Sequence, residues 1–256
     1  MIEVECYRRL AERACRREIS AVEAPDAWFC KGGTVPGNLE FALTGRQIVG
    51  VRRIGKLLLA DISGGPLLGL RFGMTGRLLV DGNAGIERLL YSSDRNREAW
   101  DRFRVRFADG GSLVLRDPRR LGGVELDPDL SKMGPDAAAV SLIGFRGALR
   151  SSAAVKAVLL DQQKMAGIGN LLADETLWRA GIAPTRMARS LAETEVKWLR
   201  TSMRTTIGLL TKRGGSHTGD LQSERRVEGR CPLDGNRLRH CTVGGRSTWW
   251  CEHHQM

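Results

Sequence analysis

Cysteine and histidine side chains gather near the C-terminal end of this 256-residue chain. Cys231, Cys241 and Cys251 lie in the last 26 residues, together with three of the four histidines. Thiolate and imidazole groups are preferred ligands of zinc, so this concentration predicts a metal site. The other three cysteines are scattered over the first 30 residues and are interpreted as ordinary buried thiols.

A second candidate site is the glycine turn Gly167-Ile168-Gly169, which lies between two segments of helical periodicity. Asn170 is typical of a helix N-cap, and the helix that follows is expected to end at Ala180, before Gly181. Backbone amides at such a helix start can bind an anion such as a DNA phosphate. From this segment alone, an ordinary helical hairpin capped by Asn170 accounts for the pattern at least as well.

The net charge of +11 and the pI near 10.0 favour a polyanionic partner. Residues 1–145 carry 22 basic and 19 acidic side chains, an excess of +3, whereas residues 146–256 carry 18 and 10, an excess of +8. Most of a phosphate-binding surface is therefore expected in the second part. A solvated basic surface without a partner is the alternative.

Membrane insertion is not expected, because no run of about eighteen apolar residues occurs. The first residues, Met1-Ile2-Glu3-Val4-Glu5, are acidic and amphipathic, unlike a signal peptide. A cytoplasmic location is therefore expected.

The elements that must position these groups change character along the chain. Residues 3–14 have helical periodicity, and residues 18–125 are predicted to be mostly short strands separated by turn-forming glycine pairs. Examples of the expected strands are Gln47–Arg53, Lys56–Ile62, Leu67–Phe72, Arg77–Val80, Phe103–Phe107 and Ser112–Arg116. From about residue 146 the period becomes helical, and the capping box Ser190-Leu-Ala-Glu193 is expected to open a long helix that ends at Gly214-Gly215.

Six stretches resemble motifs of the formamidopyrimidine-DNA glycosylase/endonuclease VIII family, in the family's order, from residue 3 to residue 255. They are EVECYRRLAE, RRIGKLLLADI, RFGMTGRL, RDPRRLGG, LLDQQKMAGIGNLLADETLWRAGIAP and GRSTWWCEHHQ. In the family these are the N-terminal helix, a lysine-bearing strand, two loops that enter DNA, the helix–two-turn–helix and the end of the zinc finger. Six ordered motifs are far more specific than any single one.

The resemblance implies how the chain meets DNA. Members of the family flip the damaged base out of the stack and fill the hole with a Met and an Arg from two loops. Met74 and Arg119 match these residues, and Leu121 stands where a wedging Phe is usual. Without the resemblance, Met74 would be interpreted as a core residue.

Three further matches imply contacts with the DNA backbone. Lys56 matches a lysine that contacts a phosphate near the lesion. Asn170 matches a phosphate-binding Asn, and Arg246 matches the zinc-finger Arg that grips the phosphate beside the flipped nucleotide.

The zinc finger of the family usually has two Cys-x-x-Cys pairs separated by sixteen residues. Here Cys231-Pro-Leu-Asp234 and Cys251-Glu-His-His254 keep that spacing but change two ligands. The resemblance therefore implies a structural zinc held by Cys231, Asp234, Cys251 and His254. Cys241 is an alternative to Asp234 as the fourth zinc ligand but ranks below it. It lies seven residues past Asp234, which on an extended strand is roughly 20 Å from the base of the hairpin. A degenerate finger without metal is the other alternative.

The catalytic start of the family, Met-Pro-Glu, has no match in this sequence. In the family the proline amine attacks C1′ of the damaged nucleotide and forms a Schiff base, and the Glu supplies acid/base chemistry. Because Glu3-Val4-Glu5 match a later part of that start, either the true start lies three codons upstream or the protein is catalytically altered. Among the residues present, Lys56, the Met1 amine and Glu3 are the catalytic candidates.

The predicted fold is α+β. A β-sandwich lobe is expected over residues 1–130, a helix–two-turn–helix DNA-binding lobe over 131–222, and a zinc-finger hairpin over 223–256. The resemblance implies a loop between Gly215 and Gly229 that closes over oxidised purines, and this chain has a shorter segment there. Specificity for 8-oxoguanine is therefore not implied, and oxidised pyrimidines, ring-opened purines and an unusual adduct all stay open as the lesion.

The leading function is a base-excision-repair DNA glycosylase that acts as a monomer on damaged duplex DNA, with AP lyase activity if Pro-Glu lies upstream of Met1. The alternative is a damaged-DNA-binding protein that kept the DNA-contacting residues and lost the catalytic nucleophile. A generic zinc-ribbon nucleic-acid binder is a weaker alternative, because it does not explain Met74 and Arg119.

Overall fold

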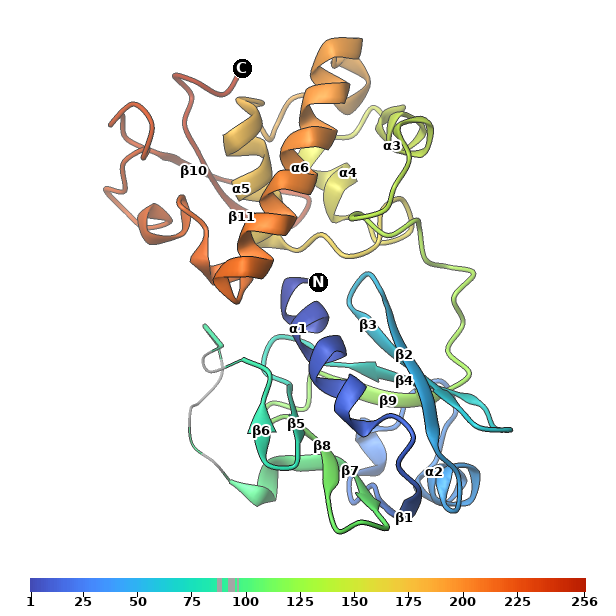
Figure 1. Ribbon diagram of the computed structural model, residues 1–256. Coiled ribbons are helices and arrows are strands. Elements are labelled where there is room, and N and C mark those ends of the chain that lie inside the picture. Colours follow the sequence, from blue (N-terminus) through green and yellow to red (C-terminus); the bar gives the residue numbers. More distant parts are fainter. Residues whose placement is uncertain (87–88, 92–94, 96) are drawn as a thin grey trace. The chain divides into compact units, whose positions relative to one another are not determined.

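The computed structural model describes residues 1–86, 89–91, 95 and 97–256 (Figure 1). The chain forms two compact units: one holds Glu3–Leu130, and the other holds Ser131–Met256 together with Met1–Ile2. Each unit has a buried apolar core of its own. Helices and antiparallel sheets occur together, so the predicted α+β class is confirmed. The division at residue 222, which would make the last part a third domain, stays a prediction.

Two antiparallel sheets make up most of the unit that spans Glu3–Leu130. The four-stranded sheet has the order β2 (Ile48–Ile54), β3 (Leu57–Ile62), β4 (Leu67–Arg71) and β9 (Gly123–Leu126). The five-stranded sheet has the order β1 (Ile19–Glu23), β7 (Asp101–Phe107), β8 (Ser112–Arg116), β5 (Arg77–Val80) and β6 (Asn83–Ala84). Consecutive strands such as β2, β3 and β4 pair through short turns, which makes them antiparallel.

The two sheets share one hydrophobic core, so the predicted β-sandwich is confirmed. Phe103, Val105 and Phe107 of β7 are buried in it, because alternate side chains of a strand point to the same face. In the other sheet Leu58 of β3 lies opposite Leu70 of β4, and both join the same core. The sandwich is therefore a rigid base for the loops that leave its strands.

The strands named as examples are all present, with ends that agree within two residues, and β1, β6 and β9 are further strands of the stretch that was predicted to be mostly strands. The prediction missed helix α2 (Pro36–Leu43), which has a proline at its first position. The helix expected over residues 3–14 is α1 (Ile2–Ala11), followed by the 3₁₀ turn η1 (Glu12–Ala14). The other 3₁₀ turns of this unit are η2 (Ala27–Phe29) and η3 (Glu98–Trp100).

The second unit is helical and ends in a hairpin. Its helices are α3 (Leu142–Leu149), α4 (Val155–Leu160), α5 (Asn170–Ala180) and α6 (Glu193–Arg213), and its hairpin is formed by β10 (Arg239–Val243) and β11 (Arg246–Trp250). Its 3₁₀ turns are η4 (Ala188–Ser190), η5 (Ser216–Thr218) and η6 (Gln222–Glu224). Figure 1 shows α5 beside α6, with the hairpin next to α5.

Helix α6 buries the apolar stripe that its sequence predicts and ends at Gly214, whose φ is +89°. The predicted capping box at Ser190 is wrong. The helix begins at Glu193, and the Glu195 carboxylate accepts a hydrogen bond from the Ala192 amide across 2.7 Å. The Ser190 hydroxyl donates instead to the Met187 carbonyl across 2.8 Å, because the chain turns through η4 before α6 starts.

Met1 and Ile2 are buried in the core of the helical unit, with exposed fractions of 6% and 1%.

None of the helices in the described part of the chain has the length and apolar character that a membrane span requires.

Candidate functional site

Three predicted DNA-contacting side chains lie on two loops of the sandwich unit. Met74 lies in the loop between β4 and β5, and Arg119 and Leu121 lie in the loop between β8 and β9. Met74 is 52% exposed and Leu121 is 44% exposed, and Arg119 is exposed as well. An exposed Met on a loop is not a core residue, so the interpretation of Met74 as core packing is wrong.

The two loops touch one another. Gly73 has a φ of +56°, and a Cβ atom at this position would lie 2.7 Å from the backbone carbonyl carbon of Leu121. A side chain could not fit there without displacing backbone, so only glycine permits this approach. Met74 and Leu121 are therefore neighbours on adjoining loops.

Lys56 lies in the turn between β2 and β3, directly after Gly55, whose φ is +59°. The prediction placed Lys56 at the start of a strand, but β3 begins at Leu57. Leu57 is buried and Lys56 is exposed, so the turn leaves the Lys56 side chain at the surface of the sandwich unit.

Asn170 is the first residue of α5, and Gly169 is its N-cap. The predicted capping role of Asn170 is therefore wrong. Its Nδ2 atom donates a hydrogen bond to the carbonyl of Ser247 in β11 across 2.9 Å. The glycine turn before it is held by Gln162, whose Oε1 accepts from the Gly167 amide at 2.9 Å and whose Nε2 donates to the Ile168 carbonyl at 3.0 Å.

A buried lysine also fixes the start of β11. Lys156 of α4 has a fully buried side chain, and its Nζ atom lies 2.7 Å from Asp174, 2.6 Å from the Thr248 hydroxyl and 3.1 Å from the Ser247 carbonyl. Burial lowers the pKa of Lys156 below its ordinary value, and the charge of Asp174 opposes that shift. The Ser247 carbonyl thus accepts from both Lys156 and Asn170.

Arg246 precedes Ser247 and is exposed at the tip of the hairpin. The shared Ser247 carbonyl brings Arg246 and Asn170 to the same end of α5. Sequence reasoning found both residues but missed Lys156 and Asp174. The signal for Lys156 was weak: a single lysine in the apolar helix VKAVLL.

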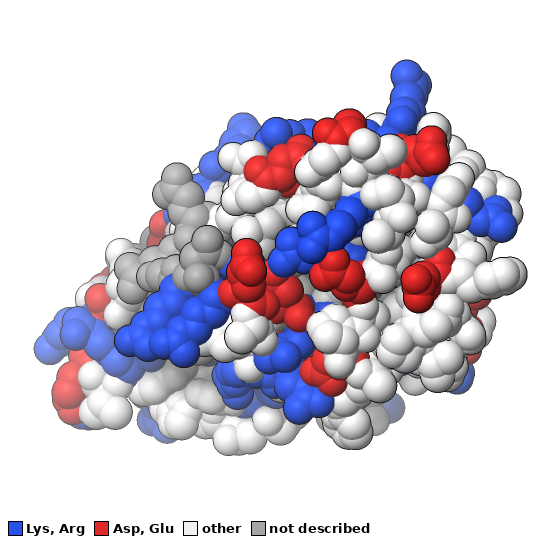
Figure 2. All heavy atoms as spheres, turned by 90° about the horizontal axis from the view of Figure 1, so that it is seen from below, with Lys and Arg blue, Asp and Glu red and all other residues white. Residues whose placement is uncertain are grey.

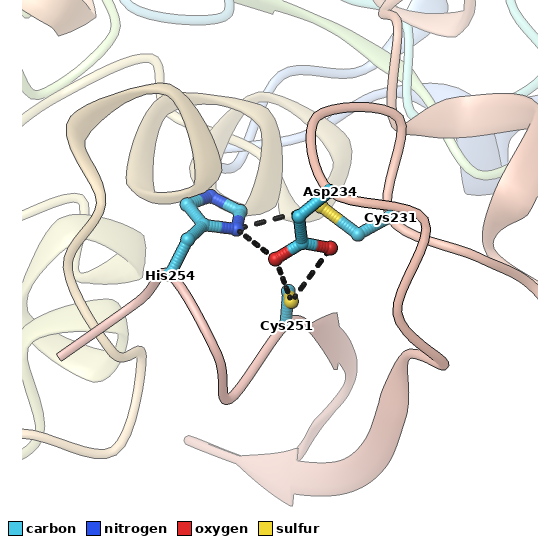
Figure 3. A group of neighbouring side chains, drawn as sticks. All are labelled: Cys231, Asp234, Cys251 and His254. Carbon is cyan, nitrogen blue, oxygen red and sulfur yellow. Dashed lines mark hydrogen bonds and ion pairs between the residues drawn. The ribbon is translucent and has the colours of Figure 1, made fainter.

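Four potential metal ligands converge at the base of the hairpin (Figure 3). One ligand atom each from Cys231, Asp234, Cys251 and His254 lies within 4.8 Å of all the others. The Cys231 sulfur is 3.4 Å from His254 Nδ1, and the Cys251 sulfur is 3.2 Å from an Asp234 oxygen. Cys241 is not in this group: it lies in β10, opposite Thr248 of β11.

The donor set fits a single tetrahedral ion such as zinc, because thiolate, imidazole and carboxylate are all zinc ligands. The Nε2 atom of His254 lies 3.0 Å from the Trp178 carbonyl. A carbonyl can only accept, so Nε2 carries the proton and Nδ1 keeps its lone pair for a metal. Burial raises the pKa of the Cys251 thiol to about 11, a shift that a bound cation would oppose.

Basic residues of the sandwich unit are often paired with acids. Arg17 contacts both Asp81 and Asp109, and Arg106 contacts Glu23. Figure 2 shows a face on which basic and acidic side chains are interspersed. Such paired arginines have their charge offset, so they are weaker candidates for phosphate binding than Arg246.

Comparison with known proteins identifies the family. The formamidopyrimidine-DNA glycosylase N-terminal domain matches residues 1–124, and the H2TH domain of formamidopyrimidine-DNA glycosylase matches residues 132–220. The chain is 31% identical over 244 residues to formamidopyrimidine-DNA glycosylase of Stenotrophomonas maltophilia strain R551-3, a match that covers 86% of each chain.

Solved structures agree with this relationship. A complex between the LlFpg protein, a THF-DNA and an inhibitor has a TM-score of 0.83 at 30% identity and covers 100% of this chain and 98% of that chain. Lactococcus lactis Fpg with a FAPY-dG containing DNA has a TM-score of 0.82 at 29% identity and covers 99% and 98%. With the two domain matches, these likenesses establish that the chain belongs to the formamidopyrimidine-DNA glycosylase family.

Proposed function

We propose that this protein excises damaged bases from duplex DNA with the residues described above in the roles that the family resemblance gives them. The observation that supports this activity is the family relationship, which extends over 86% of the chain. The protein is a base-excision-repair DNA glycosylase, and its family also has AP lyase activity. This relationship favours an enzyme over a damaged-DNA-binding protein without catalytic activity.

Met74, Arg119 and Leu121 would fill the space that a flipped base leaves in the duplex. The support is their exposure on adjoining loops of a rigid sandwich. An inserted side chain offsets part of the unstacking cost, which is a few kcal/mol for each base step. Leucine supplies an apolar wedge but stacks on a base less well than an aromatic ring.

Lys56, Asn170 and Arg246 would bind phosphates. Arg246 supplies charge without a sequence preference, and the helix start at Asn170 supplies backbone amides. The Ser247 carbonyl, which Asn170 and Lys156 both hold, would keep Arg246 and the helix start at a fixed spacing.

The group of Cys231, Asp234, Cys251 and His254 would hold a structural zinc. The four side chains would supply a complete tetrahedral ligand set, with no further protein side chain needed. The ion would link the segment that precedes β10 to the chain that follows β11, and so maintain the hairpin that carries Arg246.

The lyase step needs an amine that can attack C1′. A proline amine supplied by Met-Pro-Glu in front of Met1 would fulfil this role, and the Glu would transfer protons. In a chain that starts at Met1, the remaining candidates are the Met1 amine and Lys56, with Glu3 as the acid.

The substrate would be damaged duplex DNA, with a ring-opened purine as the first lesion to test. One related structure contains FAPY-dG in its DNA. In this chain the segment after α6 is pinned, since Glu175 accepts hydrogen bonds from the Asp220 and Leu221 amides at 3.0 Å and Asp174 pairs with Arg225. A short, pinned segment is poorly suited to close over an oxidised purine. A monomeric state and a cytoplasmic location also stay proposals.

Base release tests the proposal directly. The chain with Met-Pro-Glu in front of Met1 is incubated with a duplex that contains one FAPY-dG, with an undamaged duplex as control. We expect release of the free base only from the damaged duplex, and a large loss of this activity in Arg119→Ala. Binding of the lesion without any base release would overturn the proposal.

A further inference from the structure

The carboxylate of Asp117 lies at the base of both exposed loops. Asp117 has no exposed surface. One of its oxygens accepts a hydrogen bond from the Thr75 hydroxyl, in the loop that carries Met74, and a second from the Arg119 amide at 3.2 Å. The other oxygen accepts from the Gly122 amide at 2.7 Å.

The main chain of Asp117 is fixed to the last residue of η3 and to the strand β7 that follows it. Its amide donates to the Trp100 carbonyl across 2.8 Å, and its carbonyl accepts from Arg102 Nε across 3.0 Å. Thr75, like Asp117, has no exposed surface. The hydrogen bond between them is therefore a buried, charge-assisted link from one loop to the other, a class roughly twice as strong as neutral hydrogen bonds.

We propose that Thr75 and Asp117 are positioning residues that set Met74 and Arg119 at a fixed spacing, so that both enter the hole in the duplex together. This inference rests on the proposed roles of Met74 and Arg119. Neither Thr75 nor Asp117 needs to touch DNA. Their effect is preorganisation: loops that are already held in the bound arrangement lose less conformational freedom on binding.

Thr75→Val tests the link, because valine keeps the shape of threonine and removes the hydroxyl. We expect preference for a duplex with an abasic-site analogue over an undamaged duplex to fall about tenfold, as for loss of a hydrogen bond to a charged group. Affinity for the undamaged duplex should be unchanged. Thr75→Ser keeps the hydroxyl and should retain most of the preference.

A double-mutant cycle with Met74→Ala separates positioning from general destabilisation. If Thr75 acts through Met74, Thr75→Val should have little further effect in the Met74→Ala background. The signal of 2-aminopurine placed opposite the abasic analogue should report the same pattern, since it responds to what fills the hole. Should Thr75→Val not fold, Asp117→Asn is measured in the same cycle.

Two failures are distinguishable. If Met74→Ala itself leaves the preference for the abasic duplex intact, the proposed role of Met74 is wrong. If Met74→Ala removes the preference but Thr75→Val does not, or if the two effects simply add, the positioning role of Thr75 and Asp117 is wrong and the role of Met74 stands.

Discussion

The indole Nε1 of Trp178 donates a hydrogen bond to the sulfur of Cys231 across 3.3 Å. The carbonyl of Trp178 also accepts from the His254 ring, so one residue of α5 holds two of the four potential metal ligands. At the other end of the same helix, Asn170 bonds to the hairpin through Ser247. Helix α5 therefore connects the ligand group to the end of the hairpin that carries Arg246.

Trp178→Phe should weaken metal binding. The change removes the indole donor but keeps an aromatic ring and the carbonyl that orients His254. Loss of such an outer contact lowers metal affinity about tenfold or more. Competition with a chromophoric zinc chelator measures the effect. Trp198→Phe, at a Trp that is 54% exposed on α6, is the matched control and should leave affinity unchanged.

Loss of a ligand should remove the metal and weaken DNA binding. Cys251→Ser and His254→Ala should each lose zinc, measured by elemental analysis, because three ligands remain of a tetrahedral set. DNA affinity should fall with it, since the hairpin that presents Arg246 loses its support. Cys241→Ser should keep stoichiometric zinc. A metal-free wild type that binds DNA normally would contradict a structural zinc.

Backbone contacts should appear in the salt dependence of binding. Lys56→Ala and Arg246→Ala should weaken binding to damaged and undamaged duplexes alike. Each should also reduce by about one unit the slope of the logarithm of the binding constant against the logarithm of the salt concentration. Asn170→Ala should weaken binding to both duplexes without changing this slope, because Asn carries no charge. Arg237→Ala is the control in the same part of the chain: Arg237 pairs with Glu228 and should have little effect. A slope that stays at the wild-type value in Lys56→Ala and Arg246→Ala would exclude the proposed phosphate contacts of these two residues.

Local patterns predicted much of the fold, and partners distant in sequence account for most of what was missed. Alternation and turn glycines located the main strands, and the apolar stripe of α6 was correct. Asn170 was expected to cap its own helix, but Gly169 is the N-cap and the Asn170 Nδ2 atom donates to the Ser247 carbonyl, 77 residues away in the sequence. Strand β9 is short, and its place is set by pairing with β4 rather than by its own composition.

The residues of the candidate site also divide into those that the sequence identified and those that only the fold brings together. Met74 and Arg119 were named only through the resemblance to the family, because their types and spacing alone did not single them out. The cluster of cysteines and histidines predicted a metal site from the sequence itself, and the resemblance then implied the four ligands. Asp117 and Lys156 were missed because a buried charge becomes significant only through its partners, here Thr75 and Thr248. Such partners are brought together by the fold and leave no periodic signal in the sequence.

The Arg17 ion pairs should make stability depend on acid pH. Hydrogen bonds from Arg17 lower the pKa of Asp109 to about 2 and lower the pKa of Asp81 as well. A depressed carboxyl pKa contributes stability above its ordinary value, 3.8, and that contribution is lost as the pH falls toward 2. Arg17→Ala should therefore lower the melting temperature by about 2–4 °C at pH 6 and by less below pH 3.

The control for this effect is Arg106→Ala, which breaks a more exposed pair with Glu23. Its melting temperature should change less. Binding of damaged duplex should be unchanged in Arg17→Ala. A constant difference in melting temperature from pH 6 to pH 2 would show that Arg17 stabilises by packing rather than by its ion pairs.

Borohydride trapping on a duplex with an abasic site separates the candidate nucleophiles. Met1 and Ile2 are buried in the core of the helical unit, which restricts where a Met1 amine can reach. That amine also follows the family proline by two residues, a displacement of up to about 7 Å in an extended chain. Attack needs reacting atoms about 3–3.5 Å apart. A chain that starts at Met1 should therefore bind the duplex but be trapped poorly.

Placing Met-Pro-Glu in front of Met1 should restore trapping and strand nicking, because the proline amine then takes the position that it has in the family. Met-Pro-Gln is the matched extension: it keeps the amine and removes the acid, so trapping should persist while base release falls. Efficient trapping of the chain that starts at Met1 would show that another amine acts. Lys56→Ala then distinguishes the two candidate amines. Loss of trapping in this variant would assign the attack to Lys56, whereas trapping that continues would assign it to the Met1 amine.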